Sequence, residues 1–354
     1  MTKNNIIRLG AAASLLAVVA GTATPAFASG TNAGSTITNN VTVDYQVGGV
    51  AQTAVSASNS FTVDRKVNFT VTEDGSATTQ VSPGQLAAVT TFVVTNTSNA
   101  TLDFALAATN RSGGTAAHGG TDNFDVSNVR LYIDTNSDGD YDVGTDLQIT
   151  YLDQIAADAS ARVFVVVDVP LGRSTNDVAG VRLTGTAAEP TAAGSLGATV
   201  TETAGANTTG VDTVFADTNA DGNTARDGIS FDEDDYTIIA AAITATKTSR
   251  VVSDPFNGTT DPKMIPGAVL EYCIIVDNAA GGSAATNVAF SDTLAATTTY
   301  ESSFGVKVNG TVTSGTCNAD GAIAGSHSAG VVSGTIPTLA AGDARTMLFR
   351  VTIN

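Results

Sequence analysis

Hydrophobic and polar residues alternate along most of the chain, with the period of two that is typical of β-strands with one buried face. Pairs that favour turns (Asn-Gly, Asp-Gly, Pro-Gly and Gly-Gly) lie between the alternating segments. Short strands with such turns at roughly ten-residue spacing predict an all-β protein made of antiparallel β-sandwiches. The clearest predicted strands are 37–47, 60–72, 88–96, 102–108, 128–133, 161–169, 180–187 and 236–247.

The chain repeats part of its own pattern. Residues 81–96 and 264–278 each place a Pro-Gly turn before an alternating strand that ends in Asn. Residues 152–169 and 336–353 each place a turn containing Ala-Ala before a final strand. Self-similarity of this kind predicts repeated structural units, here two sandwich modules in tandem.

The repeat divides the chain into modules. We expect a first sandwich with acidic insertions at residues 65–245 and a second at 246–354. Residues 29–64 are expected to form an N-terminal strand pair that docks on the first module. A helix of useful length is not predicted, although residues 151–160 could form one short helical turn.

Residues 1–28 have the parts of a secretory signal peptide: a basic start with Lys3 and Arg8, an apolar stretch over 9–23, and small residues at Ala26 and Ala28. We predict cleavage after Ala28. The alternative is an N-terminal membrane anchor, but the apolar stretch is short for that role. A second apolar run of membrane length does not follow, so the expected product is secreted or on the cell surface, without a transmembrane segment once the signal is removed.

Two cysteines, Cys273 and Cys317, fit an oxidising compartment outside the cytoplasm. A disulfide between them would close a loop of about 45 residues. Two unrelated buried thiols are the alternative. Their spacing does not match a Cys-x-x-Cys redox or metal motif.

Composition excludes several partners. The chain has 16 Lys and Arg against 34 Asp and Glu, a net charge of −18. Nucleic-acid binding requires clustered basic residues, and adsorption to anionic lipid is disfavoured for the same reason. Because 42% of the residues are hydrophobic, the chain can still bury cores. The expected partners are other envelope proteins or copies of the protein itself.

The last part of the chain resembles a bacterial surface repeat, the family called domain of unknown function 11, and residues 246–354 match it best. The resemblance is carried by Lys247-Thr248, by the Pro-Gly turn and Tyr-containing strand of 264–278, by 285–294 and by the close at 336–353. Ala295 follows Leu294 where the family pattern has Pro. The resemblance implies immunoglobulin-like modules of exported, often repetitive, envelope proteins, and it implies no catalytic residue.

The sharpest local motif is an acidic loop at 134–146, whose oxygen-bearing side chains alternate around a glycine. Oxygen ligands at every second position around such a turn favour Ca²⁺. The loop has Thr145 where an EF-hand has Glu, and strands are expected on both sides, so it is not an EF-hand. The alternative is an acidic hairpin loop that only makes Asx-turns. The candidate ligands are Asp134, Asn136, Asp138, Asp140, Asp142 and Asp146.

The segment 211–236 repeats this motif more weakly and is the second candidate cation loop. The alternative is a solvated insertion whose acidic run, Asp232 to Asp235, faces water. The candidate ligands are Asp217, Asn219, Asp221, Asn223 and Asp227.

Other chemistry is not indicated. His118 and His327 stand alone in Gly-rich segments without the spacing of a zinc site, and no Gly-x-Ser-x-Gly nucleophile motif occurs. We therefore expect a non-catalytic structural protein of the bacterial envelope, such as a surface-layer component, filament subunit or spacer, stabilised by Ca²⁺. The alternatives are a Ca²⁺-dependent adhesin or ligand-binding module and, more remotely, a secreted hydrolase with an unrecognised site.

Overall fold

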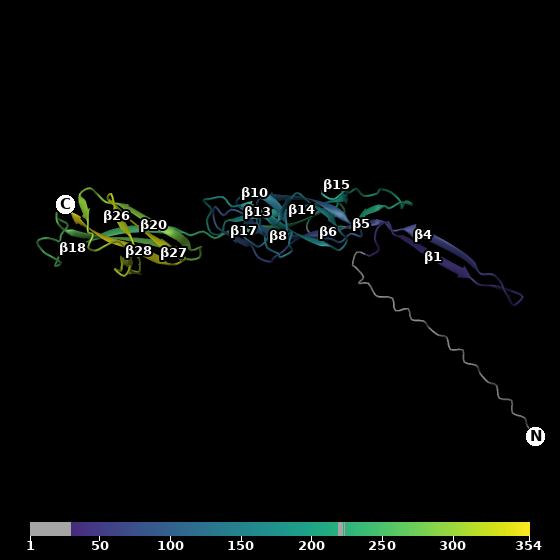
Figure 1. Cartoon of the computed structure of the whole chain (residues 1–354), viewed down its shortest axis with the longest axis horizontal. Helices are drawn as coiled ribbons and strands as arrows, with labels where there is room; N and C mark the ends of the chain where they lie inside the picture. Colours follow the sequence, from purple (N-terminus) through teal and green to yellow (C-terminus); the bar gives the residue numbers. More distant parts are fainter. Residues whose placement is uncertain (1–29, 219–221, 223) are drawn as a thin grey trace, which may run out of the picture.

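The computed structural model describes residues 30–218, 222 and 224–354. The predicted signal peptide, with its cleavage after Ala28, lies outside the described residues. Figure 1 shows three parts in a row: an N-terminal hairpin, a first sandwich and a second sandwich. The regular structure of the described residues is β-strand throughout, so the predicted all-β fold with tandem sandwiches is confirmed.

The N-terminal hairpin pairs β1 (Thr36–Val43) with β4 (Val55–Thr62) antiparallel along their whole length. Its tip carries β2 (Gln46–Val47) and β3 (Val50–Ala51). Every residue of β1 and all but the last of β4 are exposed, and the hairpin projects from the first sandwich (Figure 1). The structure thus differs from the expected docking on the first module, because the faces of the hairpin stay in solvent.

The base of the hairpin is held by Asn99 of the first sandwich. Its amide Nδ2 donates to the carbonyls of Thr31 at 3.0 Å and Asp64 at 2.9 Å. The backbone N–H of Ala33 donates to the Asn99 carbonyl at 2.9 Å. These hydrogen bonds fix where the hairpin leaves the module without covering its strands.

The first sandwich consists of two packed sheets. One has the order β11 (Leu147–Ile149), β10 (Ser127–Ile133), β13 (Ser160–Asp168), β8 (Ala88–Asn96) and β6 (Phe69–Glu73). The other has the order β12 (Tyr151–Ile155), β9 (Leu102–Asn110), β14 (Val178–Pro190), β17 (Ile229–Ile238) and β7 (Thr79–Val81), with β15 (Leu196–Thr199) beside β14. β16 (Thr213–Phe215) pairs with β5 (Arg65–Val67). The pairings are antiparallel except for β16 with β5 and β17 with β7.

Alternation along the strands builds the core of the first sandwich. In β8 every second residue, from Ala88 to Asn96, is buried. Phe69 and Phe104 meet with ring centroids 4.6 Å apart. The fully buried Tyr236 donates its hydroxyl to the Val165 carbonyl at 3.0 Å, so its polar end is satisfied inside the core.

The second sandwich packs a large sheet on a small one. The large sheet has the order β18 (Ile243–Ser253), β19 (Val269–Asn278), β28 (Ala344–Ile353), β22 (Lys307–Gly310) and β25 (Ala322–Ile323), and β21 (Thr298–Tyr300) pairs with β28. The small sheet has the order β20 (Ala285–Thr293), β27 (Val331–Leu339) and β26 (Ser326–Ser328). β23 (Val312–Thr313) and β24 (Thr316–Cys317) form a short hairpin. The core is centred on Ile336, Leu339, Met347 and Phe349, all fully buried.

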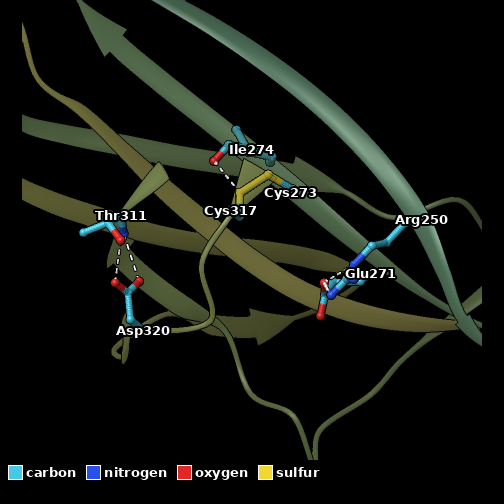
Figure 2. Close-up of a disulfide and its surroundings, with 7 residues drawn as sticks. All are labelled: Arg250, Glu271, Cys273, Ile274, Thr311, Cys317 and Asp320. Atoms are coloured by element: carbon cyan, nitrogen blue, oxygen red, sulfur yellow. Dashed lines mark hydrogen bonds and ion pairs between the residues drawn. A yellow bond between two sulfur atoms is a disulfide. The ribbon is translucent and has the colours of Figure 1, made fainter. Parts of the chain in front are cut away.

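The predicted disulfide is confirmed. Cys273 of β19 and Cys317 of β24 are bonded with an S–S distance of 1.98 Å (Figure 2). The bond ties the short β23–β24 hairpin to the large sheet, where Ile275 and Leu348 pack against it.

A charged ladder crosses the same sheet. Arg250, Glu271 and Arg350 lie directly opposite one another on β18, β19 and β28. The Glu271 side chain is 3% exposed, and its two oxygens lie 2.6 Å from Arg250 Nη2 and 2.8 Å from Arg350 Nη2. Figure 2 shows the Arg250–Glu271 pair near the disulfide. A carboxylate shared by two guanidinium groups on neighbouring strands fixes the pairing of all three.

The sequence repeat corresponds to a buried asparagine that holds a turn. Asn96 ends β8, and its Nδ2 donates to the carbonyls of Ala100 at 2.9 Å and Ile155 at 2.8 Å. Its backbone N–H and carbonyl bond to Ala159 and Asp158 in the turn before β13.

Asn278 does the same in the second sandwich. It ends β19, and its Nδ2 donates to the carbonyls of Ser283 at 2.8 Å and Leu339 at 3.1 Å. Its backbone bonds to Gly342 and Asp343 in the turn before β28. In both modules the repeated Asn therefore joins the end of its strand to the turn before the last strand, and we call this arrangement the asparagine clamp.

Four predicted segments differ from the structure, and the first of them, 37–47, is divided between β1 and β2. Residues 60–72 are divided among β4, β5 and β6, and residues 151–160 form strand β12 and a turn rather than a helical turn, because β12 pairs with β9. Residues 236–247 are not one strand, since β17 ends at Ile238 and β18 begins at Ile243. The boundary between the sandwiches therefore lies at 239–242, slightly before the predicted one.

The junction at 239–242 is hydrogen bonded to both sandwiches. Thr175 of the first sandwich bonds through its hydroxyl to both the carbonyl and the N–H of Ala240, at 3.1 and 3.0 Å. Ser283 of the second donates its backbone N–H to the Ala240 carbonyl at 3.1 Å and its hydroxyl to the Ile239 carbonyl at 2.9 Å. A Cβ at Gly282 would lie 2.2 Å from the Ala240 oxygen, so glycine is required there.

Candidate functional site

The first acidic loop connects β10 to β11 in the first sandwich. Its carboxylates accept hydrogen bonds from the loop's own backbone. Asp134 accepts from Ser137 N at 2.6 Å and from Gly139 N at 3.1 Å. Asp146 accepts from Thr135 N at 3.0 Å and from Asp142 N at 2.8 Å. These bonds are those expected of the Asx-turn alternative.

The exposed side of this loop brings three predicted ligands together. Asn136 Nδ2 lies 2.7 Å from Asp138 Oδ2 and 3.1 Å from Asp142 Oδ2. The Asp140 N–H donates to Asp138 Oδ1 at 3.0 Å, and this hydrogen bond lowers the pKa of Asp138. Asp140 thus contributes its backbone, and its side chain is exposed.

The second acidic loop is described only in part. Asn219, Asp221 and Asn223 lie outside the described residues. Asp217 is buried and accepts from the N–H groups of Asp227 at 3.1 Å and Gly228 at 3.3 Å, which fixes the turn before β17.

The acidic run Asp232 to Asp235 does not face water as a loop. It lies in β17, in register with β14, and Asp234 and Asp235 are buried. Charged residues are disfavoured in strands, and the local sequence therefore suggested an insertion. Tertiary partners reverse that preference: Glu233 pairs with Arg182 at 2.5 Å and with Arg111 at 3.0 Å.

The run brings together a cluster that the sequence did not indicate. His118 Nε2 lies 3.0 Å from Glu73 Oε1 and 3.3 Å from Asp234 Oδ1. Glu73 ends β6, Asp234 lies in β17, and His118 belongs to the loop between β9 and β10. Within the described residues this is the one place where ligand atoms of three His, Cys, Asp or Glu side chains lie within 4.8 Å of one another. We name it the Glu73–His118–Asp234 cluster.

Burial gives this cluster unusual electrostatics. The side chains of Glu73, His118 and Asp234 are 14%, 15% and 5% exposed. Burial, and to a lesser degree the charge of Glu73, raises the pKa of Asp234 to about 7. The sequence signal that could have revealed the cluster is an acidic run directly before the apolar strand end at 236–238, since a strand carries alternate residues inward.

The N-terminal hairpin presents a second candidate surface. One face carries Ile37, Val41, Val43, Val55 and Phe61, because Ile37 pairs with Phe61 and Val43 with Val55, and the polar pair Asn39–Asn59 lies between them on the same face. All five are exposed, Phe61 by 55%. The opposite face carries Thr and Ser, and Thr38 and Ser60 hydrogen bond through their hydroxyls at 2.7 Å. The hairpin is therefore amphipathic, and its apolar face is in solvent.

Comparisons with known proteins add little. No family model and no curated protein matches the chain. The C-terminal domain of the AgI/II polypeptide BspA from Streptococcus agalactiae is 8% identical, with a TM-score of 0.33, over 82% of this chain and 91% of that one. A Corynebacterium diphtheriae protein described as membrane anchored is 10% identical, with a TM-score of 0.20, over 90% of this chain and 89% of that one. Scores this low support no conclusion about function. Among the described residues, no helix has the length and apolarity needed to span a membrane.

Proposed function

We propose that the protein is an exported, non-catalytic structural protein of the bacterial envelope that associates with copies of itself through its N-terminal hairpin. The observation that carries this proposal is the exposed apolar face of the hairpin, which projects from one end of two sandwiches in a row (Figure 1). Large apolar side chains gathered on one exposed face mark interaction sites in soluble proteins.

The strand edges of the hairpin support the same function. β1 and β4 pair only with each other, so each has one open edge. Natural proteins protect such edges with Lys, Pro or bulges, and β1 and β4 contain no Lys, no Pro and no register shift. A two-stranded hairpin is also marginally stable by itself in water. Strand addition from another copy would cover both the edge and the apolar face.

The test is the oligomeric state of the purified protein. Val41→Ser with Phe61→Ser removes two large side chains from the apolar face without adding charge to the strand edges, and Thr42→Ala with Ser60→Ala is the matched control on the polar face, since neither pair is directly opposite across the strands. We expect light scattering and negative-stain electron microscopy to show assemblies that the first pair abolishes and the control retains. A wild-type protein that stays monomeric at high concentration would reject self-association.

Export is tested separately. The N-terminal sequence of the protein recovered from the envelope or medium should begin at Ser29. Envelope fractionation and electron microscopy that show no surface, fibre or matrix association would reject the envelope role.

A Ca²⁺-dependent adhesin is the second candidate, and it rests on the two carboxylates, Asp138 and Asp142, that both accept hydrogen bonds from the Asn136 amide and that a cation could bind in its place. A cation bound only to the folded state raises the melting temperature by mass action. Millimolar Ca²⁺ should then raise it, and Asp134→Ala with Asp138→Ala should abolish the rise. A melting temperature insensitive to both Ca²⁺ and EGTA would leave the loop as Asx-turns.

A further inference from the structure

In the Glu73–His118–Asp234 cluster, two carboxylates face the same imidazole nitrogen. Nε2 of His118 is buried and makes no hydrogen bond, although Glu73 Oε1 and Asp234 Oδ1 are 3.0 and 3.3 Å away. We propose that these three side chains bind a divalent transition-metal ion of the zinc class. The proposal goes beyond the structural function proposed above, which needs no metal.

The distances fit one shared ion. Zinc bonds to imidazole nitrogen and carboxylate oxygen are about 2.0–2.2 Å long, so two ligands of a tetrahedral zinc lie about 3.3–3.5 Å apart. The two nitrogen–oxygen distances fall at or slightly below this range. A ring N–H could serve one acceptor only, whereas a cation between the three atoms satisfies all of them.

Hydrogen bonds to neighbouring aspartates hold the ligands in place. The backbone N–H of Glu73 donates to Asp232 Oδ2 at 2.7 Å, and the backbone N–H of His118 donates to Asp235 Oδ2 at 2.7 Å. Asp235 is fully buried, and its Oδ1 lacks a hydrogen-bond partner. These bonds fix the backbone at Glu73 and His118, and thereby the positions from which the two side chains reach the cluster.

The charge around the cluster favours a cation. Glu73, Asp234 and Asp235 are three carboxylates with little exposure, and His118 is the basic side chain that contacts the first two. The nearby arginines, Arg111 and Arg182, form their ion pairs with Glu233. Buried charges are normally paired or coordinate a metal, and a divalent ion would balance this excess.

The donor set selects the metal class. Ca²⁺ and Mg²⁺ take oxygen ligands, whereas zinc and its neighbours take imidazole together with carboxylate. A hollow of about 500 Å³ opens beside the cluster, lined by Glu73 and His118 together with Arg111, Arg182 and their partner Glu233. Water from this hollow can complete the coordination.

The test is titration of the purified protein with ZnCl₂ by isothermal calorimetry in the presence of excess CaCl₂. The chain has two histidines, which gives a matched pair of variants: His118→Gln and His327→Gln. His327 is an exposed residue of the second sandwich, stacked on Tyr300. We expect one zinc per chain, an affinity weakened by about 100-fold or more in His118→Gln because a direct ligand is lost, and no change in His327→Gln.

Cobalt provides an independent readout. Co²⁺ bound in a site with one imidazole should give visible d–d absorption that His118→Gln removes and His327→Gln keeps. Thermal melting of each variant in EDTA shows whether it is folded without metal. If His118→Gln does not fold, Glu73→Gln replaces it as the variant that lacks a ligand.

Two outcomes would overturn the proposal. Zinc binding that survives His118→Gln but is lost in Asp134→Ala with Asp138→Ala would place the ion in the acidic loop. No zinc binding at all would make the cluster a proton-dependent ion pair. Neither outcome bears on self-association, which is measured by light scattering.

Discussion

The two sandwiches end an equivalent strand with the same buried asparagine, yet they are reinforced differently. Asn96 and Asn278 each bond to the turn before the last strand of the repeat. The first sandwich adds a core with several fully buried aromatic rings, including Phe92 and Tyr236. The second adds the disulfide, and each sandwich also has a carboxylate shared by two arginines, Glu233 in the first and Glu271 in the second. The buried asparagine is thus common to both modules, whereas the further stabilisation differs: aromatic burial in the first sandwich and a covalent bond in the second.

Removal of the disulfide should have the largest effect on the difference in stability between the two sandwiches. Cys273→Ser with Cys317→Ser releases a covalent loop with a sequence separation of 44 residues. The free energy of unfolding of the second sandwich should fall by about 4 kcal/mol, because the unfolded chain regains that loop entropy. Calorimetry should show one transition moving and the other unchanged. Equal shifts would mean that the two sandwiches unfold as one unit.

The two asparagine clamps should be worth similar amounts. Asn96→Ala and Asn278→Ala each leave buried carbonyls without donors, which should cost about 3 kcal/mol in the sandwich that carries the change. Denaturant unfolding of the two variants measures both losses. If only one of the two variants lost stability, the repeated asparagine would be a similarity of sequence without the same structural role in both sandwiches.

The charged ladder should have a smaller effect, confined to the second sandwich. Glu271→Ala leaves Arg350 without its carboxylate partner and should cost about 2 kcal/mol, less than for a fully buried pair because both arginines are partly exposed. Arg345→Gln is the control, since its pair with Asp343 is more exposed and should contribute less than about 1 kcal/mol. Thermal melting that ranks these two the other way would contradict the ladder's role.

Acid should weaken one loop of the second sandwich, and this is the smallest expected effect. Backbone N–H groups of Asn257, Lys263 and Phe256 lower the pKa of Asp254 from 3.8 to about 2. A lowered carboxyl pKa stabilises the fold above about pH 4, and this contribution is lost as the pH falls towards 2. Asp254→Asn should therefore flatten the dependence of the second melting transition between pH 4 and 2. An unchanged slope would show that other carboxylates dominate it.

The sequence predicted what depends on local pattern. Strand 88–96 was predicted with the bounds of β8, because its alternation is unbroken, and the pairing of Cys273 with Cys317 followed from their number and compartment. The break at 239–242 was missed, because its apolar residues continue the pattern while their bonds go to Thr175 and Ser283.

The Glu73–His118–Asp234 cluster was missed for a related reason. Its members come from a strand end, a glycine-rich loop and a different sheet, so no spacing along the chain joins them. His118 alone gave no signal, and the acidic run at 232–235 suggested a loop. Only the register of β17 against β14, and the loop bonded to Asp235, bring the three side chains together.

The short junction also decides how the molecule carries load. Any tension between the hairpin and the second sandwich must pass through residues 239–242. There Thr175 of the first sandwich and Ser283 of the second donate their hydroxyls to neighbouring carbonyls, those of Ala240 and Ile239. Hydrogen bonds from both sandwiches to this one short segment restrict how its peptides can turn. Because a Cβ at Gly282 would lie 2.2 Å from the Ala240 oxygen, Gly282→Ala would displace the segment to which both sandwiches are bonded, and a single methyl group would thereby change how the two are joined.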